Sequence, residues 1–367
     1  MKVYWLFNHP APYKVNFFNV LGKFIEIHAV FERKSEWGRN ASFYKEKPEN
    51  FTQTICNSLP LGERNNWTRE PVRILKKNHY DLVIINGWAQ FSEQNVIAYC
   101  KKHRIPYVFY INGGITPEKE FKWKYNLKRR NISGAFAYLC PDESSKQYLI
   151  HYGAEEKRIF FYPYSTIYES SIIPHSESYA HRKRVRKEDG YPFDHFFISS
   201  GSFIPRKNYE ELITIWKDLP EDYGLLIVGE GPLKQKYESL IQELGLSQRV
   251  FLSPFMPHEK LLETFRYCDG FVFTSKYDIY GHVINEALSQ GLPVVSSDRV
   301  NAAKHLIQNG VNGYQVDIDN PRAIQEAILS INEDMRSEAI KTAKENTIEK
   351  SADFHLKFFN SLLEALK

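Results

Sequence analysis

Two kinds of segment alternate along this chain, and their alternation is the feature that most constrains its fold. Short runs rich in β-branched and aromatic residues, such as 3–7 and 81–85, are followed by longer amphipathic stretches, such as 92–102. Strands joined by helical crossovers pair in parallel, and a parallel sheet needs helices on both of its faces. The sequence therefore predicts an α/β protein.

The pattern predicts a similar set of elements in each half. In the first half we expect strands at 3–7, 25–31, 81–85, 106–110, 135–139 and 159–162, and helices at 15–22, 92–102 and 143–152. In the second half we expect strands at 196–200, 225–228, 250–252, 270–274 and 293–295, and helices at 208–218, 233–244, 260–266, 283–290 and 302–308.

A chain of 367 residues is too long for one ordinary core and suits two domains of roughly 150 to 200 residues. The polar stretch 165–192 is the expected boundary, so we predict one domain at 1–170 and another at 190–350. The basic run 181–187 within it has the composition of a nucleic-acid patch. We favour a solvated helix that opens the second domain, and we expect no nucleic-acid partner.

Charge is distributed unevenly along the chain. Residues 1–190 carry a net charge of +11 and residues 191–367 one of −7, which together give the +4 of the whole chain. A basic half suits an anionic partner such as nucleic acid, a membrane surface or a lipid diphosphate. A basic face that is simply solvated is the alternative.

Cysteine usage and hydropathy favour a cytoplasmic protein that is soluble or sits on a membrane surface. The four cysteines, at positions 56, 100, 140 and 268, form no C-x-x-C pair, so we expect neither a zinc site nor a disulfide framework. No apolar run approaches the ~20 residues of a spanning helix. The five apolar residues at 3–7 look like a strand rather than a signal peptide.

Several common catalytic motifs are absent from the sequence. Neither half has G-x-G-x-x-G after its first strand, which disfavours a nicotinamide dehydrogenase. The chain also lacks a P-loop, H-E-x-x-H and G-x-S-x-G.

The most informative segment is 274–288, where a predicted strand turns through Gly281 into a helix. Backbone N–H groups at a helix start favour a diphosphate. Asp278 precedes the helix and Glu286 follows eight residues later, so the two acids could hold two ends of one ligand. Acids at helix starts are also ordinary capping residues, and the spacing alone leaves both interpretations open.

Two further turns strengthen the prediction of a phosphate site. Arg206 and Lys207 follow the strand at 196–200 and Gly201, and two cations beside a strand-to-helix turn suit a diphosphate. Gly229 lies in the turn after the strand at 225–228, where glycine lets a ligand approach the backbone. A solvated loop and a plain turn are the respective alternatives.

Taken together, these segments resemble the retaining family 4 glycosyltransferases of the GT-B fold, in which two Rossmann-like domains face each other across a cleft. The stretches 225–232, 285–298 and 302–316 match the family closely. The family's E-x7-E motif maps onto Asp278 and Glu286. The resemblance implies that the nucleotide-sugar donor is bound by Gly201, Arg206, Lys207, Gly229, Tyr280, Gly281, His282 and Glu286.

Three departures from the family pattern affect the expected roles. The first acid is Asp278 rather than Glu, and Arg206 replaces the family's arginine next to Gly201. The first-domain position that the family often fills with a histidine is Asn112. The resemblance implies catalytic roles for Asp278, Lys207 and Asn112, and the two replacements leave the roles of Asp278 and Asn112 open.

The first half resembles glycosyltransferases that build bacterial surface polysaccharides, through 8–23 and 144–165. The resemblance places Tyr13, Lys14, Gly113 and Gly114 on the acceptor side of the cleft. It also implies that the last amphipathic segment, within 351–367, crosses back onto the first domain.

Cations and aromatic residues are mixed in 119–130. This segment could insert Phe121, Trp123 or Tyr125 into an anionic membrane interface, or form a half-buried surface helix.

The resemblance implies a retaining glycosyltransferase that transfers a sugar from a UDP- or dTDP-sugar to a saccharide or a polyprenyl-diphosphate-linked acceptor, in cell-surface or capsular polysaccharide biosynthesis. No D-x-D pair suited to magnesium is found, and we expect neither a metal nor another cofactor. Two alternatives remain: a GT-B nucleotide-sugar epimerase, and a non-catalytic GT-B scaffold for a partner glycosyltransferase.

Overall fold

The computed structural model describes residues 1–35, 44–61 and 65–366, and the chain divides into two compact units. The first unit comprises Met1–Thr166 and Thr347–Lys367, and the second comprises Ile167–Asn346. Residues 171–189, which the sequence left between two domains, belong to the second unit, as do 167–170, which were predicted in the first domain. Residues 347–350, predicted in the second domain, belong to the first unit.

The first unit is built on a seven-stranded sheet in which every neighbouring pair is parallel. Buried aliphatic and aromatic residues form its central strands, as a sheet covered on both faces requires. The strand order is β3 (Thr52–Ile55), β2 (Glu26–Phe31), β1 (Lys2–Phe7), β6 (Leu82–Asn86), β7 (Val108–Tyr110), β8 (Ala137–Cys140), β9 (Ile159–Phe161). A small antiparallel hairpin adds β4 (Leu59–Leu61) and β5 (Asn65–Trp67).

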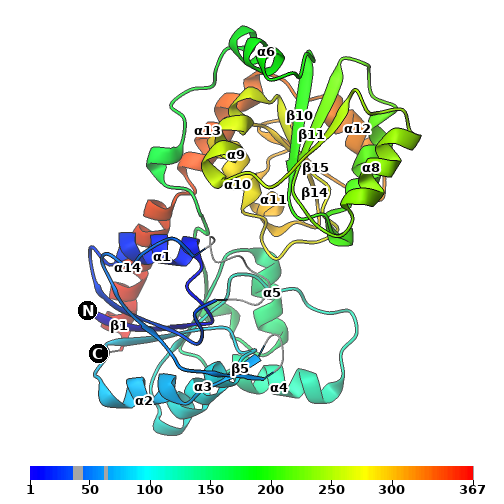
Figure 1. The fold of residues 1–367 in the computed structure, drawn as a ribbon. Helices are drawn as coiled ribbons and strands as arrows, with labels where there is room; N and C mark the ends of the chain where they lie inside the picture. The colour runs from blue at the N-terminus through cyan, green and yellow to red at the C-terminus, as the bar shows by residue number, and fades with distance from the viewer. Residues whose placement is uncertain (36–43, 62–64, 367) are drawn as a thin grey trace. The chain divides into compact units, whose positions relative to one another are not determined.

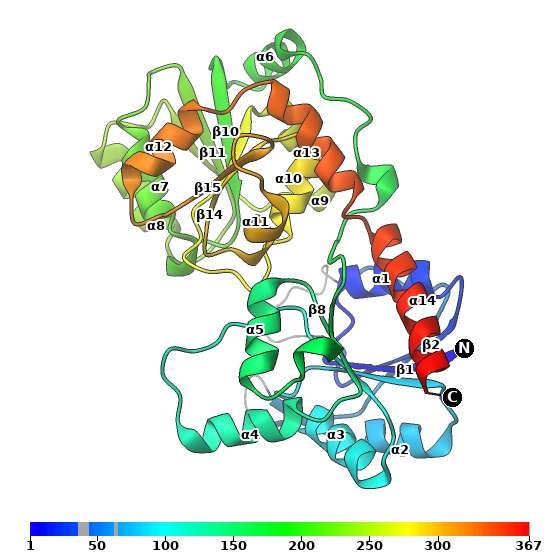
Figure 2. The ribbon, with the colours of Figure 1, turned by 180° about the vertical axis from the view of Figure 1, so that it is seen from behind.

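Helices cover both faces of this sheet (Figures 1 and 2). One face carries α1 (Pro12–Leu21) and α14 (Ile348–Ala365), which pack together. The other carries α2 (Glu70–Lys77), α3 (Phe91–His103), α4 (Lys122–Ile132) and α5 (Glu143–His151). The expected return of the C-terminal segment is confirmed.

The return of α14 is held by aromatic packing. The His355 ring centroid lies 4.8 Å from that of Phe17 on α1, and the Phe359 centroid lies 5.8 Å from that of Trp5 on β1. Trp5 is fully buried, so α14 completes the core of the first unit.

The second unit has a six-stranded parallel sheet in a doubly wound order. The order reverses between β10 and β13, and ligands in such sheets bind at the carboxyl ends of the strands next to this reversal. The strands run β12 (Val250–Ser253), β11 (Tyr223–Val228), β10 (His195–Ser200), β13 (Gly270–Phe273), β14 (Val294–Ser297), β15 (Gly313–Val316).

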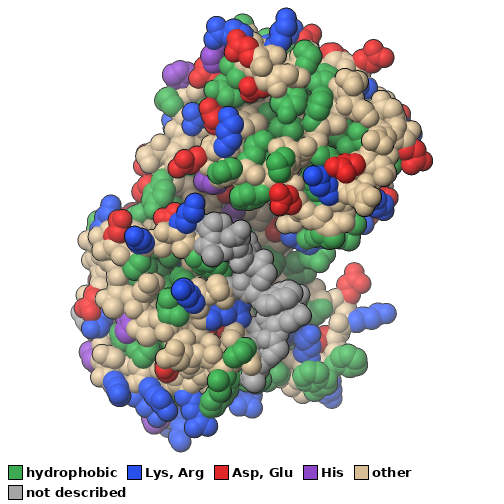
Figure 3. Space-filling model, viewed as in Figure 1, with side chains coloured by type: hydrophobic (Ala, Val, Ile, Leu, Met, Phe, Trp, Pro, Cys, Tyr) green, Lys and Arg blue, Asp and Glu red, His purple; other side chains and the backbone are tan. Residues whose placement is uncertain are grey.

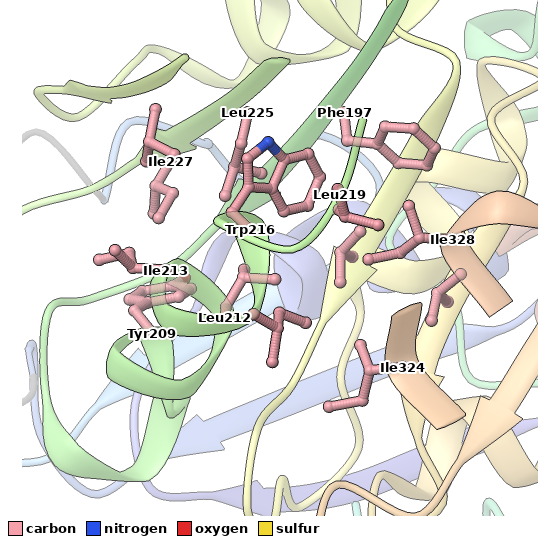
Figure 4. Close-up of a cluster of buried hydrophobic side chains, with 14 of the residues drawn as sticks. Phe197, Tyr209, Leu212, Ile213, Trp216, Leu219, Leu225, Ile227, Ile324 and Ile328 are labelled. Atoms are coloured by element: carbon pink, nitrogen blue, oxygen red, sulfur yellow. The ribbon is translucent and has the colours of Figure 1, made fainter. Parts of the chain in front are cut away.

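Two layers of helices enclose the second sheet. On one face Trp216 is fully buried among Leu225, Phe197 and Ile328, as Figure 4 shows. That face carries α7 (Tyr209–Trp216), α8 (Lys234–Glu243) and α12 (Pro321–Leu329). The other carries α9 (His258–Tyr267), α10 (Val283–Ser289), α11 (Asn301–Leu306) and α13 (Asp334–Lys344).

The basic run at 181–187 forms a helix, α6 (Tyr179–Glu188), but the expectation that this helix is solvated is wrong in part. Arg182 and Arg186 are 0% and 2% exposed, and both donate to the buried carboxylate of Asp269. One face of α6 is therefore an internal ion-pair surface.

Candidate functional site

Two loops meet at the carboxyl edge of the second sheet, on either side of the reversal in strand order. One follows β10 and contains the 3₁₀ turn Pro205–Lys207, and the other follows β13. The backbone N–H of Lys276 donates to the carbonyl of Arg206 at 2.8 Å, and the Thr274 hydroxyl donates to the carbonyl of Lys207 at 3.3 Å. The two segments that the sequence singled out are thus joined into one site.

A compact charge cluster lies where these loops meet. The carboxylate Oδ2 of Asp278 accepts from a guanidinium nitrogen of Arg206 at 2.7 Å and from the Lys207 ammonium at 2.8 Å. Lys207 is buried, and its ammonium lies 4.3 Å from the ring centroid of Phe273. Two cations converge on a single carboxylate, which leaves the cluster with a formal charge of +1.

Burial and pairing act in opposite directions on this cluster. Burial lowers the pKa of Lys207, although the Asp278 carboxylate opposes that shift. For Asp278 burial disfavours the charged form, but Lys207 and Arg206 outweigh it and hold the pKa below its usual value. The carboxylate therefore stays ionised and balances the cations until another anion replaces it.

The glycines of this edge permit close contact between loops. A Cβ on Gly229 would lie 2.0 Å from the carbonyl oxygen of Gly201, and one on Gly231 would lie 2.6 Å from that of Phe203. The Phe203 N–H also donates to the Glu230 carbonyl at 2.8 Å. Gly229 and Gly231, which follow β11, thus allow the loop that carries Arg206 and Lys207 to approach closely.

Gly281 forms the turn before α10. Its φ is +101°, and a Cβ there would lie 2.7 Å from Cγ1 of Val300. The preceding Tyr280 is buried, with its ring centroid 5.0 Å from that of His282. Burial lowers the pKa of His282 to about 4, so this imidazole is neutral at physiological pH.

Glu286 lies in the first turn of α10, and its side chain is 15% exposed. One carboxylate oxygen lies 4.0 Å from Nδ1 of His258, the first residue of α9. His258 was not predicted from the sequence, since nothing in the local pattern around α9 indicates a neighbour on α10.

In the first unit, Asn112 and Tyr13 lie together beyond the carboxyl ends of β7 and β1. Nδ2 of Asn112 lies 3.5 Å from the Tyr13 hydroxyl, and both side chains are partly exposed. Gly114 packs on Tyr148, where a Cβ would lie 2.7 Å from the ring, and Gly113 has a φ of +153°. The predicted acceptor-side residues Tyr13, Asn112 and Gly113 thus gather at one sheet edge.

The side chain of Lys14, which the sequence placed on the acceptor side, is buried in the structure. The ammonium donates to Oδ1 of Asn8 at 2.7 Å and lies 4.4 Å from the ring centroid of Phe7. The buried carboxyls of Glu32 and Glu93 explain why a cation is retained there, since each has its pKa raised by burial and lowered in part by Lys14.

Within the described ranges, no three His, Cys, Asp or Glu side chains gather as they would around a metal ion. Asp317 and Asp319 have the D-x-D spacing just after β15, and both carboxylates are paired with Arg299.

The fold and the domain models define the class. The model for glycosyl transferases group 1 matches residues 181–348, and that for Glycosyltransferase Family 4 matches residues 39–163. HepE of Anabaena, solved with UDP, superposes with a TM-score of 0.74 over 98% of this chain and 100% of its own, at 16% identity. Sucrose-phosphate synthase of Thermosynechococcus elongatus gives 0.75 over all of both chains, at 15% identity. This is the GT-B fold.

Each half of the chain thus matches a glycosyltransferase domain, the first half the Family 4 model and the second half the group 1 model. The N-acetylgalactosaminyltransferase of Campylobacter jejuni that acts on a diphospho-undecaprenol-linked sugar is 30% identical over 44% of this chain and 43% of its own length. The lipopolysaccharide core glycosyltransferase LpsE of Rhizobium meliloti is 32% identical over 36% of this chain and 38% of its own length. The chain thus matches about two fifths of the length of these curated relatives.

Proposed function

We propose that this protein is a retaining glycosyltransferase that transfers a sugar from a UDP- or dTDP-sugar to a saccharide or lipid-linked saccharide. The cluster of Arg206, Lys207 and Asp278 beside the reversal in strand order carries this proposal. The relatives support a role in building cell-surface sugars, since one acts on a diphospho-undecaprenol-linked sugar and another builds a lipopolysaccharide core. We therefore assign the protein to cell-surface polysaccharide biosynthesis.

Donor binding exchanges the partners of the charge cluster. The donor diphosphate takes Lys207 and Arg206 from Asp278, which releases the carboxylate to accept hydrogen bonds from hydroxyls of the sugar. Glu286, on α10 behind Gly281, accepts from the ribose hydroxyls. The phosphate charge that grows as the glycosidic bond breaks is then met by fixed cations.

The transfer step uses no nucleophile from the protein. The acceptor hydroxyl oxygen forms a bond to the anomeric carbon on the face that the diphosphate leaves, and its proton passes to a departing phosphate oxygen. One C–O bond forms and one breaks on the same face of the sugar, so the configuration at the anomeric carbon is retained.

A nucleotide panel tests the proposal directly. We expect UDP or dTDP to raise the melting temperature of the wild-type protein, and UDP- or dTDP-sugars to be hydrolysed slowly without acceptor. Lys207→Ala should lose both effects, whereas Lys260→Ala, at an exposed position of α9, should keep them. A scaffold would bind no nucleotide, and an epimerase would release the nucleotide and an epimerised sugar without any acceptor.

The proposed reaction is metal-independent, because Arg206 and Lys207 supply the charge that magnesium supplies elsewhere. We predict that turnover of the identified donor is unchanged by excess EDTA. Activity that is lost in EDTA and restored by magnesium would contradict the metal-free mechanism.

We further propose that the enzyme works at the inner face of the cell membrane, held there by its first unit. Among the described helices, none has both the length and the apolar character to span a bilayer. At the start of α4, Phe121 and Trp123 are 74% and 66% exposed, beside exposed Lys122 and Lys124. Exposed aromatic rings next to cations suit an anionic interface.

Two residues of the same segment face inward and are not part of that surface. The Tyr125 hydroxyl donates to the carbonyl of His151 at 3.2 Å. Lys128 is buried and forms an ion pair with Glu120 at 2.6 Å. The membrane-facing set is therefore Phe121, Trp123, Lys122, Lys124, Arg129 and Arg130.

A further inference from the structure

A buried tyrosine holds the asparagine that replaces the family's histidine. The Tyr162 hydroxyl lies 3.0 Å from the carbonyl oxygen of Ile111 and 3.2 Å from Oδ1 of Asn112, and its single proton is shared between these two acceptors. On its other side, the Asn112 carboxamide faces the Tyr13 hydroxyl. The partly exposed carboxamide is thus held between two phenol groups, one buried and one at the surface.

Tyr162 is itself held rigidly. Its side chain is 2% exposed, and its ring stacks on Tyr110 with centroids 4.6 Å apart. The His355 ring of α14 packs on the same tyrosine at 5.2 Å. Burial raises the pKa of Tyr162 well above its usual value, so the hydroxyl remains protonated and continues to donate.

We propose that Tyr162 is a positioning residue, which fixes the Asn112 carboxamide so that it hydrogen-bonds the reacting sugar during transfer. The proposal rests on the proposed function and adds a residue that does not touch the substrate. A carboxamide alone at a sheet edge rotates freely about its last bond, and freezing that rotation favours a reactive geometry. Tyr162 supplies the fixed partner on the buried side.

The geometry also explains why an amide can replace a titrating ring. An asparagine cannot change charge, so it needs only to be oriented, and Tyr162 orients it through one hydrogen bond. Restoring a histidine there brings back a group that titrates near pH 6.5. Asn112→His should therefore add an acid limb to the pH–rate profile that the wild-type enzyme lacks.

A double-mutant cycle separates positioning from mere packing. We expect Tyr162→Phe to lower kcat about five- to tenfold with the donor KM unchanged, since one hydrogen bond is lost and the ring remains. Asn112→Ala should lower kcat further. The double variant should be as slow as Asn112→Ala alone, because Tyr162 acts only through Asn112.

Tyr107 provides a matched control. It is 3% exposed, lies next to β7, and its hydroxyl has no hydrogen-bond partner among the described residues. Tyr107→Phe should therefore leave kcat unchanged. Multiplicative losses in the double variant, or a wild-type kcat in Tyr162→Phe, would overturn the positioning role.

A second measurement does not depend on turnover. Nitrogen relaxation of the Asn112 side-chain amide, assigned by its disappearance in Asn112→Ala, should report a rigid group in the wild type and in Tyr107→Phe. Tyr162→Phe should make it mobile. An amide that is equally mobile in all three proteins would overturn the inference even if donor turnover is found. A wild-type protein that turns over no donor would instead reject the proposed function.

Discussion

At the scale of single residues, the site neutralises part of its positive charge with its own carboxylate. Asp278 contacts both Arg206 and Lys207, so the ligand-free protein carries a ready counterion for a buried lysine. Without it, the buried ammonium would lose this counterion and lie against the ring of Phe273. Removing one partner of such a buried ion pair destabilises the protein strongly. A second anion that enters the site can instead take the place of the carboxylate.

This arrangement predicts a pH dependence of nucleotide binding. Burial lowers the pKa of Lys207 from 10.5, so the ammonium loses its proton at a lower pH than an exposed lysine does. Only the protonated form attracts a diphosphate. UDP affinity, measured by calorimetry from pH 7 to pH 10, should fall as pH rises through that lowered pKa.

Lys207→Arg serves as the comparison, since a guanidinium stays charged above pH 12. The variant should bind UDP with little change over the same range. If both proteins weaken in parallel, the alkaline loss belongs to another group.

Glu286 gives a second residue-scale prediction. Each hydrogen bond from a ribose hydroxyl to the carboxylate contributes about 1.5–3 kcal/mol, and glutamine keeps one of the two acceptor oxygens. Glu286→Gln should weaken UDP binding about ten- to a hundredfold and leave the circular dichroism spectrum unchanged. Glu263→Gln, at an exposed position of α9, should bind as the wild type does. Equal affinities for all three proteins would remove Glu286 from the site.

At the scale of elements, α6 is attached to the second unit by charge rather than by apolar packing. Asp269, just before β13, accepts from Arg182, Arg186 and the backbone N–H of Phe196. Glu333 at the start of α13 also pairs with Arg182. Arg336 of α13 lies buried nearby and donates to the Cys268 carbonyl at 2.9 Å.

Removing the shared acceptor should therefore destabilise the second unit. Asp269→Asn removes the carboxylate that Arg186 and Arg182 share, and although Arg182 keeps its pair with Glu333, breaking the buried Arg186 pair costs about 3–5 kcal/mol. Thermal denaturation should show a markedly lower melting temperature. Asp194→Asn, which breaks only the exposed pair with Lys183, should melt as the wild type does. Similar melting of both variants would mean that the buried cluster stabilises nothing.

The elements that the sequence predicted are those with a strong local pattern. The strands at 3–7 and 225–228 and the helix at 143–152 are apolar or amphipathic over their full length, and the structure places each within two residues. The missed strand β3 reads Thr-Gln-Thr-Ile, with no buried residue. It is a strand because β2 offers it a free edge, which is a tertiary cause.

The same distinction applies to the site. The motif residues Lys207, Asp278 and Glu286 could be picked out because spacing and residue type suggested their chemistry. Three contacts depend instead on packing between distant segments. Asp278 binds both cations, the Lys14 side chain is buried, and Tyr162 holds Asn112. No local pattern carries that information.

At the scale of the whole molecule, the basic half distributes its charge over several surfaces. Figure 3 shows Lys and Arg side chains gathered along the lower border of the first unit, over α2 and α3. Exposed cations there include Arg73, Lys76, Lys77, Lys101, Lys102 and Arg104. Since each cation near an anionic surface contributes ~1 kcal/mol, several together suffice for reversible binding.

We accordingly predict that the protein sediments with liposomes rich in anionic lipid and not with neutral ones. Binding should weaken with salt, because the Debye length falls from ~10 Å at 0.1 M to ~3 Å at 1 M. Gln at Lys122, Lys124, Arg129 and Arg130, with buried Lys128 retained, should reduce binding but not UDP affinity.

The aromatic contribution needs its own variant. Phe121→Ser with Trp123→Ser should reduce binding at high salt, where charge is screened. Phe24→Ser, at a residue 63% exposed elsewhere on the first unit, should not. If equal amounts of protein sediment with neutral and with anionic liposomes, the membrane proposal is wrong and the basic half is simply a solvated surface.

The position of α14 in the sequence has a consequence for biogenesis. A ribosome releases the chain in order, so the first unit emerges with β1 and α1 but without the helix that covers Trp5 and Phe17. That aromatic surface stays uncovered while all of 167–346 is translated. Maturation of the first unit is thus delayed until the second has been made, and a holdase chaperone that recognises aromatic surface would find its target on the nascent chain during that interval.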